Sequence, residues 1–465
     1  MSTSTRILLK TFGCRLNEAE LEGWAQGFRA RGFELAGDDE PADLVVLNTC
    51  AVTAEAARKS RQWLRRAHRT HPQARLVVSG CLASLEAADL VLEAGVELLV
   101  DNRDKDRLVE IAAAALDLPL RPESATAGAA NPLFARGRQR AFVKVQDGCR
   151  HACTFCVTTL ARGPERDRPL PEIVTAIDDL SADGVREVVL TGVHLGGYGS
   201  APGSQHGSDL AALVRAVLGQ TQVPRVRLGS LEPWDLPDGF WDLFADPRLM
   251  PHLHLPMQSG ADAVLRRMAR RCKVAEFARL ATAGRAAVPG LNLTTDIIVG
   301  FPGETASEWR ETLAFVAAMG FGQVHCFTYS PRAGTRAATL PGQADADTKR
   351  ARVLELKALA QRLRRQVFAS QIGRDCRVLR EGETRGGQPG DLFGYTPNYL
   401  PVRIHAHPDA PPVGEVLDVN IRGIDADGAA LRGTLFMRSH DSGTSPAADE
   451  GFAGHLGGSS NDVPR

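Results

Sequence analysis

Strand-like apolar runs and helical patterns alternate along the first 120 residues of this 465-residue chain. The apolar runs cover residues 6–12, 43–48, 75–79 and 96–100. The helical patterns cover residues 17–31, 54–71, 82–94 and 104–116. A helix in every connection between strands is typical of an open parallel sheet. The sequence therefore predicts an N-terminal domain of the α/β class over residues 4–120.

Three cysteines follow three successive strands of this predicted sheet. Cys14, Cys50 and Cys81 each come after an apolar run. The carboxyl ends of parallel strands lie at one edge of a sheet, where ligands bind. We therefore expect the three thiols to converge, and three thiolates suit a [4Fe–4S] cluster that leaves one iron open. The alternative is three inert buried thiols.

The most specific motif is a cysteine triplet with the spacing C-x3-C-x2-C. Cys149, Cys153 and Cys156 lie just after a strand predicted over residues 141–145. Three thiolates on one loop can hold three irons of a [4Fe–4S] cluster, and the fourth iron is then free to bind a small molecule. A structural zinc loop is the alternative. Zinc needs a fourth ligand, however, and His151 lies inside the motif, badly placed to close such a site.

A second series of strands and helices surrounds and follows the triplet. Strands are predicted over residues 141–145, 185–191, 225–231, 252–255, 293–299 and 323–329. Helical patterns separate them, and a long helix over residues 345–370 closes the region. Six strand–helix units over residues 135–370 predict a partial (β/α)6 barrel, whose active site lies at the C-terminal ends of its strands.

The composition changes on both sides of this predicted barrel. Residues 121–134 are rich in Pro and Ala and are expected to form a linker. Residues 371–437 carry short β-rich runs separated by Gly and Pro, which predict a small C-terminal β-barrel. Residues 438–465 are rich in Gly, Ser and Asp and are expected to be a disordered tail.

The whole chain has a net charge of +0, so any basic surface must be local. No apolar run approaches the length that a membrane span needs, and we expect no membrane partner. The N-terminus lacks a secretory signal, so a cytoplasmic location is expected. Nine cysteines in such a chain are not a disulfide framework. Cys272, Cys326 and Cys376 fall outside both cysteine patterns, and we assign them no role.

Both cysteine patterns resemble known sequences. The triplet, with Phe155 before its third cysteine, resembles the radical S-adenosylmethionine superfamily. Three other segments are similar to the N-terminal domain of the methylthiotransferases, namely Gly13-Cys14-Arg15-Leu16-Asn17, Asn48-Thr49-Cys50-Ala51-Val52-Thr53 and Ser79-Gly80-Cys81. In that family this domain is followed by a radical domain and by a small, TRAM-like β-barrel that binds RNA. The resemblance covers residues 5–436, which is nearly the whole chain.

The resemblance implies an enzyme that uses S-adenosylmethionine and two [4Fe–4S] clusters. The implied metal ligands are Cys14, Cys50, Cys81, Cys149, Cys153 and Cys156. One S-adenosylmethionine is cleaved to a radical that abstracts hydrogen from an unreactive carbon, and another gives its methyl group to the inserted sulfur. No catalytic side chain is expected beyond the cluster ligands.

The loops after the barrel strands are expected to bind S-adenosylmethionine, because a barrel presents its ligand loops at that face. The expected contacts are Phe155, Thr191, Gly192, Ser230, Glu232, Gln258, Asp296 and Gly300. Glycine lets the backbone approach a ligand closely. The alternative for each single loop is a tight turn without a ligand, because turn glycines are common.

Three branches of the family differ in substrate. Two modify adenosine 37 of tRNA, bearing either an isopentenyl or a threonylcarbamoyl group, and the third modifies an aspartate of a ribosomal protein. Segments 13–20, 48–62, 145–149 and 161–166 resemble the threonylcarbamoyladenosine branch. Its product is 2-methylthio-N6-threonylcarbamoyladenosine. A departure follows Cys156, where the family usually shows two branched aliphatic residues, Pro and an aromatic, and this chain has Val157-Thr158-Thr159-Leu160.

The implied partners are the anticodon loop of tRNA, an electron donor and a sulfur source, and the sequence identifies neither of the last two. A non-catalytic iron–sulfur protein that binds RNA is a further alternative. The predicted C-terminal barrel is not basic: residues 371–436 contain seven arginines, no lysine and nine acidic residues. This net charge of −2 is weak for binding phosphates by charge alone.

Positive charge is concentrated in the first two domains. The basic residues form three runs: Arg58, Lys59, Arg61, Arg65, Arg66 and Arg69; Arg136, Arg138, Arg140 and Lys144; and Arg162, Arg166 and Arg168. We expect a distributed surface that contacts phosphates across both domains. The alternative for each run is an ordinary solvated face, because Arg and Lys are usually surface residues.

Overall fold

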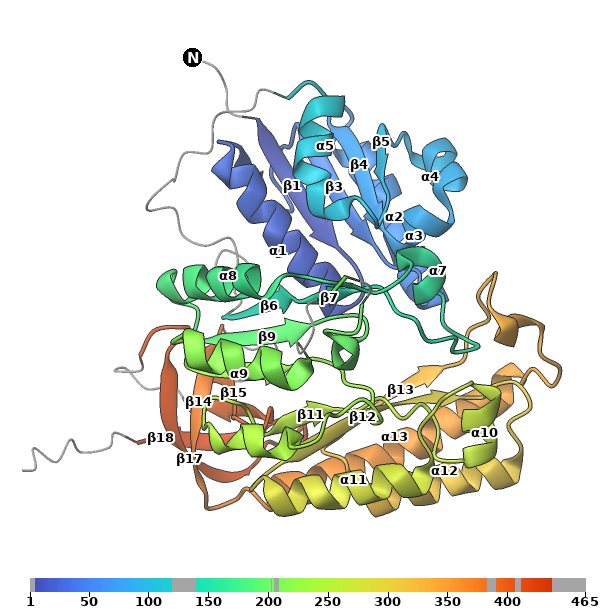
Figure 1. The fold of residues 1–465 in the computed structure, drawn as a ribbon, viewed down its shortest axis with the longest axis vertical. Coiled ribbons are helices and arrows are strands. Elements are labelled where there is room, and N and C mark those ends of the chain that lie inside the picture. The colour runs from blue at the N-terminus through green and yellow to red at the C-terminus, as the bar shows by residue number, and fades with distance from the viewer. Residues whose placement is uncertain are drawn as a thin grey trace, which may run out of the picture.

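The computed structural model describes residues 5–118, 139–201, 203–204, 209–382, 390–405 and 411–436. The expected linker and the expected C-terminal tail lie outside these described residues. Figure 1 shows the N-terminal domain in blue, a larger α/β barrel in green and yellow beneath it, and a small β-barrel in orange and red. Among the described residues, no helix is both long and apolar enough to cross a membrane.

The N-terminal domain is built on a five-stranded, fully parallel sheet with the order β2-β1-β3-β4-β5. Its strands are β1 (Arg6–Thr11), β2 (Glu34–Ala36), β3 (Leu44–Thr49), β4 (Arg75–Gly80) and β5 (Leu98–Val100). Its α-helices are α1 (Arg15–Ala30), α2 (Ala54–Thr70), α3 (Cys81–Leu85), α4 (Ala87–Ala94) and α5 (Leu108–Ala115). The predicted open parallel α/β sheet is confirmed.

Strand β3 shows why this sheet carries helices on both faces. Val45 and Leu47 pack on one side with residues of α2, α3 and α4, and Leu44 and Val46 pack on the other with residues of α1 and α5. Successive side chains of a strand point to opposite faces. A strand that is apolar at every position therefore requires cover on both sides, as is typical of parallel sheets.

The central domain contains six parallel strands that follow one another in sequence order. These strands are β6 (Arg140–Lys144), β9 (Glu187–Thr191), β10 (Arg225–Leu228), β11 (His252–His254), β12 (Asn292–Val299) and β13 (Gln323–Thr328). They form two three-stranded sheets, β6-β9-β10 and β11-β12-β13. Parallel bridges pair Val226 with Leu249 and Ser230 with His254 between these sheets. The predicted partial (β/α)6 barrel is confirmed.

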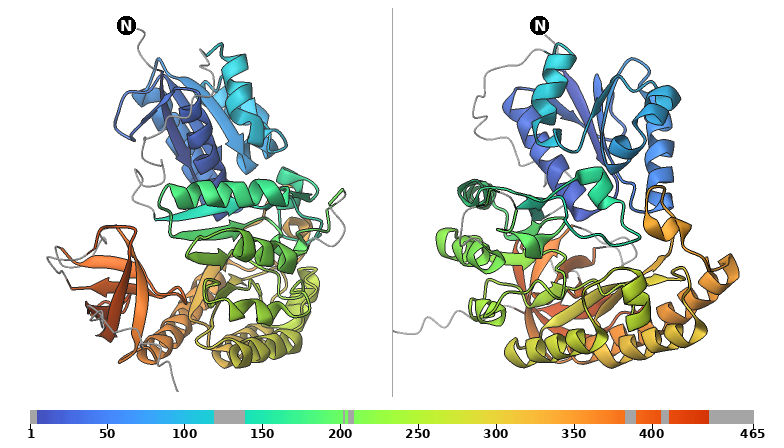
Figure 2. Two further views of the ribbon diagram at one scale, coloured as in Figure 1. Left: turned by 60° about the vertical axis from the view of Figure 1, so that its left-hand side comes forward. Right: turned by 45° about the vertical axis from the view of Figure 1, so that its right-hand side comes forward.

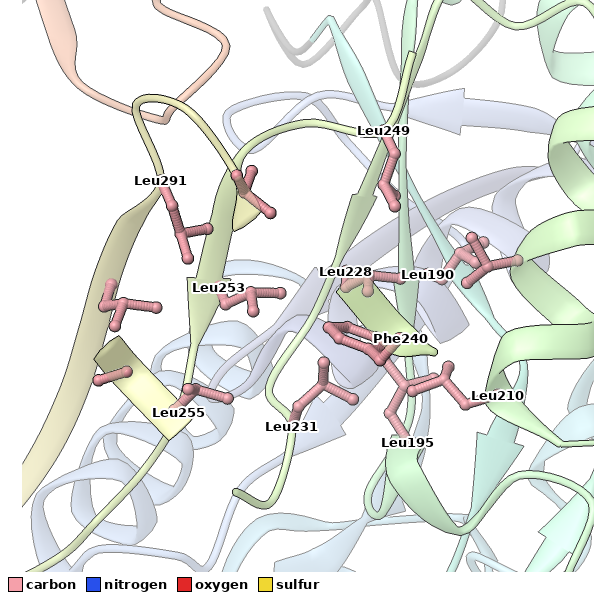
Figure 3. Close-up of a cluster of buried hydrophobic side chains, with 14 of the residues drawn as sticks. Leu190, Leu195, Leu210, Leu228, Leu231, Phe240, Leu249, Leu253, Leu255 and Leu291 are labelled. Carbon is pink, nitrogen blue, oxygen red and sulfur yellow. The ribbon is translucent and has the colours of Figure 1, made fainter. Parts of the chain in front are cut away.

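Helices cover the outside of this barrel (Figure 1). They are α8 (Leu170–Ala182), α9 (Leu210–Gln220), α10 (Asp262–Arg267), α11 (Val274–Ala287), α12 (Ala306–Met319) and α13 (Ala346–Ala369). Figure 3 shows part of the core between strands and helices, where Leu190, Leu228 and Leu253 meet Leu210 and Phe240. All five side chains are buried, so the hydrophobic effect holds the helices on the strands.

Short elements follow the first barrel strand. The strands β7 (Gln146–Asp147) and β8 (Arg166–Asp167) pair antiparallel, and the helix α7 (Thr158–Arg162) lies between them. The predicted cysteine triplet occupies the loop between β7 and α7. The N-terminal domain contacts this region through α1, where Ala19 packs against Phe142 and Val189 of the barrel.

The C-terminal domain is a closed five-stranded barrel with the order β14-β15-β16-β18-β17, as predicted for a small β-barrel. Its strands are β14 (Asp375–Glu381), β15 (Leu392–Tyr395), β16 (Pro401–Ile404), β17 (Val416–Ile424) and β18 (Leu431–Leu435). Phe368, near the end of α13, belongs to its core. Figure 2 shows the small barrel beside the end of this helix.

Three local expectations differ from the structure. The helix expected over residues 82–94 is two helices, because Glu86 has an extended φ of −134° that breaks the helical path. The edge strand β2 has only three residues and gives little periodic signal. Strand β15 was also missed, since Gly394 interrupts its pattern. That glycine is needed there, because a Cβ atom would meet the Leu379 carbonyl oxygen and the Val378 side chain.

Candidate functional site

The three N-terminal cysteines lie at the carboxyl ends of three neighbouring strands. Cys50 follows β3, Cys81 begins α3 directly after β4, and Cys14 precedes α1 just beyond β1. The loop that carries Cys14 lies against Cys50, because a Cβ atom on Gly13 would come within 2.6 Å of the Cys50 Sγ atom. All three cysteines line one cavity. The structure thus brings together the thiols that are separated in sequence.

The electrostatics of these thiols fit a metal centre. Cys50 and Cys81 are buried whereas Cys14 is exposed, and burial raises the pKa of Cys50 to about 12. The other two thiols contribute to this increase, because like charges close together disfavour ionisation. Thiols of this kind stay protonated on their own, whereas a bound metal ion deprotonates them. Three convergent cysteines are the donor set of an iron–sulfur cluster with one open iron.

The second cysteine group lies on the loop before α7. The Cys156 N–H donates to the Cys153 carbonyl oxygen (3.1 Å), which folds this loop back on itself. Two backbone N–H groups donate to sulfur: His151 to Cys149 Sγ and Thr158 to Cys156 Sγ, both at 3.4 Å. Hydrogen bonds to the sulfurs set the properties of a cluster. The loop therefore has the donor set and the polar contacts of an iron–sulfur site.

A buried arginine accompanies this loop. Arg270 Nη1 lies 3.9 Å from Cys153 Sγ. The same guanidinium donates to both carboxylate oxygens of Glu232, at 3.0 and 2.6 Å, and stacks 4.4 Å from the ring of Trp234. Glu232 was predicted from its place after the third barrel strand, whereas nothing in the sequence pattern singled out Arg270.

Among the described residues, His151 groups with His194 and Asp235 rather than with the three thiols of the zinc alternative. Its Nε2 atom lies 3.0 Å from Nε2 of His194, and 3.7 Å from the carboxylate of Asp235. His194 also pairs with Glu165 and, at 2.6 Å, with Asp235. Burial acts to lower the pKa of His194, but these two carboxylates raise it above its ordinary value. The imidazole of His151 is thus engaged in a histidine–carboxylate cluster that sequence reasoning missed.

The expected S-adenosylmethionine contacts all lie in the barrel, and three of them line the cavity: Thr191, Gly192 and Ser230. Asp296 lies inside the barrel beside His254, with 3.2 Å between its carboxylate and the imidazole Nε2. His254 and His325 also line the cavity, and their rings pack edge to face. These histidines were not predicted.

The remaining expected contacts are held by the protein itself. Gln258 has a left-handed φ of +74°, and its backbone pairs with β12. The Gly300 N–H donates to the Glu304 carboxylate at 3.0 Å. The ring of Phe155 packs edge to face against Phe301. A role of all eight expected residues in binding S-adenosylmethionine stays a prediction.

A cavity of about 990 Å³ lies where the three domains meet. The N-terminal domain contributes its three cysteines, the barrel contributes strand-end residues such as Thr191 and Ser230, and the C-terminal domain contributes Tyr395 and Tyr399. This volume is at the upper end of the range for ligand sites and can hold a nucleoside-sized group.

The C-terminal side of the cavity is both aromatic and cationic. The rings of Tyr395 and Tyr399 stack at 4.8 Å, and the guanidinium of Arg140 lies over both. Arg227 lies 4.6 Å from the ring of Tyr399, and Arg15 Nη2 donates to its hydroxyl oxygen at 3.1 Å. Tyr399 has a φ of +66°, a strained conformation for a bulky residue that persists where its surroundings hold it. No sequence pattern pointed to these tyrosines.

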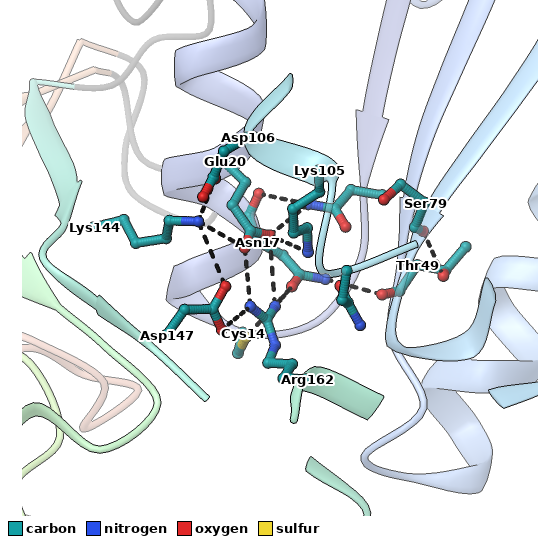
Figure 4. A network of polar contacts seen from close by, with 12 residues as sticks. Cys14, Asn17, Glu20, Thr49, Ser79, Lys105, Asp106, Lys144, Asp147 and Arg162 are labelled. Atoms are coloured by element: carbon teal, nitrogen blue, oxygen red, sulfur yellow. Dashed lines mark hydrogen bonds and ion pairs between the residues drawn. The ribbon is translucent and has the colours of Figure 1, made fainter. Parts of the chain in front are cut away.

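The expectation of a basic surface requires correction at two of its members. Arg162 has a side chain that is only 1% exposed, and it pairs with Glu20 and Asp147 in a buried network (Figure 4). Arg140 is also buried, and it pairs with Glu381. Burying an arginine requires a carboxylate partner, so these charges are used between domains rather than on the surface. On α2, in contrast, Arg58, Lys59, Arg65, Arg66 and Arg69 are exposed as expected.

Comparisons with known proteins agree with this architecture. The model of "Uncharacterized protein family UPF0004" matches residues 6–101, and that of the "Radical SAM superfamily" matches residues 143–316. A solved structure of the radical S-adenosylmethionine methyltransferase TsrM from Kitasatospora setae, with cobalamin and a [4Fe–4S] cluster bound, shares the fold. It has a TM-score of 0.55 at 17% identity and covers 72% of this chain and 77% of that one.

Two curated relatives extend over nearly the whole chain. The threonylcarbamoyladenosine tRNA methylthiotransferase MtaB of Bacillus subtilis (strain 168) is 34% identical over 430 residues, covering 89% of this chain and 93% of the relative. The tRNA-2-methylthio-N(6)-dimethylallyladenosine synthase of Anaeromyxobacter sp. (strain K) is 36% identical over 446 residues, covering 92% and 94%.

The barrel and its cysteine loop define a radical S-adenosylmethionine enzyme with a second three-cysteine centre in its N-terminal domain. The full-length relatives go further: the chain belongs to the radical S-adenosylmethionine tRNA methylthiotransferase family. The cofactors of this class are S-adenosylmethionine and two [4Fe–4S] clusters, and the two cysteine groups have the donor chemistry that such clusters require.

Proposed function

We propose that the protein converts N6-threonylcarbamoyladenosine at position 37 of tRNA into 2-methylthio-N6-threonylcarbamoyladenosine. The observation that carries this proposal is the single cavity lined by the N-terminal cysteines, the mouth of the barrel and the C-terminal domain. Cys14, Cys50 and Cys81 hold one cluster in this proposal, and Cys149, Cys153 and Cys156 hold the other. When bound, the clusters and S-adenosylmethionine supply the radical cleavage of a C–H bond and the methylthio group.

The chain's own contribution is to bind and orient the nucleoside. The apolar residues Phe142 and Val189 line the cavity and can face a base. The N-terminal thiols line the same cavity, so a base held there lies close to the sulfur chemistry. A preorganised site of this kind lowers the entropic cost of bringing the reacting groups together.

Two arginines support the threonylcarbamoyl branch. This substituent carries a carboxylate, whereas a dimethylallyl group is uncharged. Arg15 and Arg364 line the cavity, and within the described part of the chain neither forms an ion pair with a carboxylate. A carboxylate bound to a guanidinium gains a charge-assisted hydrogen bond of about 1.5–3 kcal/mol. The sequences around Cys14 and Cys50 and the Bacillus subtilis relative favour the same branch.

The dimethylallyl substrate is the second candidate, because the Anaeromyxobacter relative has a similar identity and coverage. The two candidates are separated by incubating the reconstituted enzyme with tRNA that bears one or the other modification and analysing the nucleosides by mass spectrometry. We expect a methylthio mass gain on threonylcarbamoyladenosine only. A gain on dimethylallyladenosine alone would assign the other branch, and a gain on a ribosomal-protein aspartate alone would exclude both.

The arginines provide a matched test of the reasoning. Arg15→Gln is expected to raise KM for threonylcarbamoyl tRNA about tenfold, the effect of losing one charge-assisted contact. Arg279→Gln, at an exposed position of helix α11 on the outside of the barrel, serves as the control for general loss of positive charge. Equal effects of the two substitutions on KM would show that Arg15 does not recognise the substituent. In cells that lack the protein, tRNA is expected to lose the methylthio group and accumulate its threonylcarbamoyl precursor.

A further inference from the structure

Arg162 is a buried residue of the radical domain that reaches into the N-terminal cysteine centre. It ends α7, the short helix that follows Cys156, and its side chain is 1% exposed. It lines the same cavity as Cys14, Cys50 and Cys81. Figure 4 shows its guanidinium beside Cys14, Asn17 and Glu20, all of which belong to the N-terminal domain.

The guanidinium is fixed by four hydrogen bonds to three side chains. Nη1 donates to Glu20 Oε1 and to Asp147 Oδ1, both at 2.9 Å, and Nη2 donates to Asn17 Oδ1 at 2.8 Å and to Glu20 Oε2 at 3.5 Å. Lys105 pairs with Glu20 at 2.6 Å from the opposite side. Burial opposes ionisation of Arg162, but the two carboxylates hold its pKa well above the ordinary value. The residue is therefore a permanent, immobile positive charge.

Asn17 connects this charge to the thiols. Its Nδ2 atom donates to the carbonyl oxygens of Phe12 (2.8 Å) and Thr49 (3.1 Å), so its Oδ1 atom must point the other way. That single oxygen accepts from both Arg162 Nη2 (2.8 Å) and Cys14 Sγ (3.6 Å). The guanidinium of Arg162 and the thiol of Cys14 therefore both contact the same oxygen atom of Asn17.

The positive charge of Arg162 lies close to the N-terminal cysteines. Its guanidinium and Cys14 Sγ contact the same atom, Asn17 Oδ1, and Arg162 lines the same cavity as Cys50 and Cys81. The Arg162 side chain is only 1% exposed, so solvent ions screen its interaction with neighbouring groups only weakly. A cluster bound by three thiolates carries negative charge, and one-electron reduction increases it.

We propose that Arg162 is a positioning residue of the N-terminal centre, through which the radical domain raises the reduction potential of the cluster held by Cys14, Cys50 and Cys81. A positive charge near a cluster stabilises its reduced form. Because the arginine and the cysteines come from different domains, the electrostatic environment of this cluster is complete only when the two domains are docked. The reduction potential of the N-terminal cluster therefore depends on the docking of the two domains.

The proposal is tested with Arg162→Gln and Arg162→Lys in the holoenzyme carrying both clusters. Each cluster is titrated by EPR-monitored reduction. In Arg162→Gln the N-terminal cluster is expected to become harder to reduce, with at least a tenfold change in its oxidised-to-reduced ratio at fixed potential, or about 59 mV for one electron. Arg162→Lys keeps the positive charge. It is expected to change the oxidised-to-reduced ratio of the N-terminal cluster less than threefold, which corresponds to less than about half of the 59 mV shift in potential.

The matched control is Arg270→Gln, which removes the buried arginine beside Cys153 at the other centre. It is expected to shift the potential of the radical cluster and to leave the N-terminal cluster unchanged. Iron and sulfide analysis accompanies each variant. Loss of the N-terminal cluster in Arg162→Gln but not in Arg162→Lys also supports a role for the charge.

Two results would overturn the proposal. One is an unchanged potential of the N-terminal cluster in an Arg162→Gln protein with full iron content. The other is an equal effect of the Gln and Lys substitutions, or an equal shift of both clusters, which would reduce Arg162 to a structural contact between domains. None of these measurements uses tRNA, so their outcome is independent of the proposed substrate.

Discussion

Gly80 is the residue at which a single methyl group should do most damage to the N-terminal cysteine centre. It ends β4 directly before Cys81 and has a left-handed φ of +98°. A Cβ atom there would meet the Thr49 carbonyl oxygen and would lie 2.6 Å from both Thr49 N and Asn48 Oδ1. These are mostly backbone atoms of β3 directly before Cys50, so they cannot move without displacing that cysteine as well.

The cost of Gly80→Ala has two parts. The left-handed backbone costs an alanine about 1–2 kcal/mol, and overpacking against backbone adds about 1–3 kcal/mol. The control is Gly184→Ala, because Gly184 has a similar φ of +92° and no described atom within 4 Å of the added methyl group. Only the first part applies there. At about 4 °C for each kcal/mol, Gly80→Ala should lower Tm by about 8–20 °C and the control by about 4–8 °C.

The assay combines thermal unfolding with iron analysis of the reconstituted protein. Gly80→Ala is expected to reduce the iron content from about eight to about four atoms per chain, because only the cluster of the C-x3-C-x2-C loop forms normally. The control keeps both clusters. Equal Tm values and equal iron contents for the two variants would refute the argument that close approach of β3 and β4 positions these cysteines.

Arg66 and Arg69 lie on the exposed face of α2, and replacing both by Gln is expected to weaken tRNA binding. Filter binding at several salt concentrations should show that the slope of log K for tRNA binding against log salt concentration falls by about 1.5–2. An unchanged slope would show that α2 does not contact the tRNA. Glu187 is buried, and although burial opposes its ionisation, Arg227 lowers its pKa to about 2. Because this folded pKa lies below the unfolded value of about 4.3, its stabilisation is present above that value and is lost as pH falls toward 2. Glu187→Gln should therefore lower the free energy of unfolding at pH 7 by about 3–5 kcal/mol and make this free energy less dependent on pH below pH 5. A denaturation midpoint equal to that of the wild type at pH 7 would contradict the prediction. Burial raises the pKa of Cys149 to about 12. In the cluster-free protein, the rate at which Cys149 is alkylated should therefore rise about tenfold per pH unit between pH 7 and 10, as measured by mass spectrometry. An alkylation rate independent of pH would show that the thiol is already ionised.

Much of the fold could be predicted from periodicity alone. The alternating strands and helices led to the parallel sheet and to the partial barrel, because strands such as β3 and β9 are apolar along most of their length and helices such as α9 have a buried face. The failures are local. Strand β2 is too short to carry a pattern, and β15 contains Gly394, whose role becomes visible only when the carbonyl of Leu379 is placed against it.

The candidate site could be predicted only in part. The spacing of Cys149, Cys153 and Cys156 is local and therefore visible in the sequence, and the strand-end rule extended the reasoning to the N-terminal cysteines. The neighbours of these cysteines were not visible. Arg270 lies more than 100 positions beyond Cys153, and Tyr399 belongs to another domain than the arginines that it contacts.

The sequence by itself determined the three domains and the two cysteine groups, because strand and helix periods, turn residues and closely spaced thiols are properties of short segments. Only the tertiary structure decided how these parts act on one another. It turned Arg162 from an expected surface charge into a buried link with Glu20 and Asn17, more than 140 positions away. The physical reason is that electrostatic contacts depend on distance and burial, and both are set when the domains pack together.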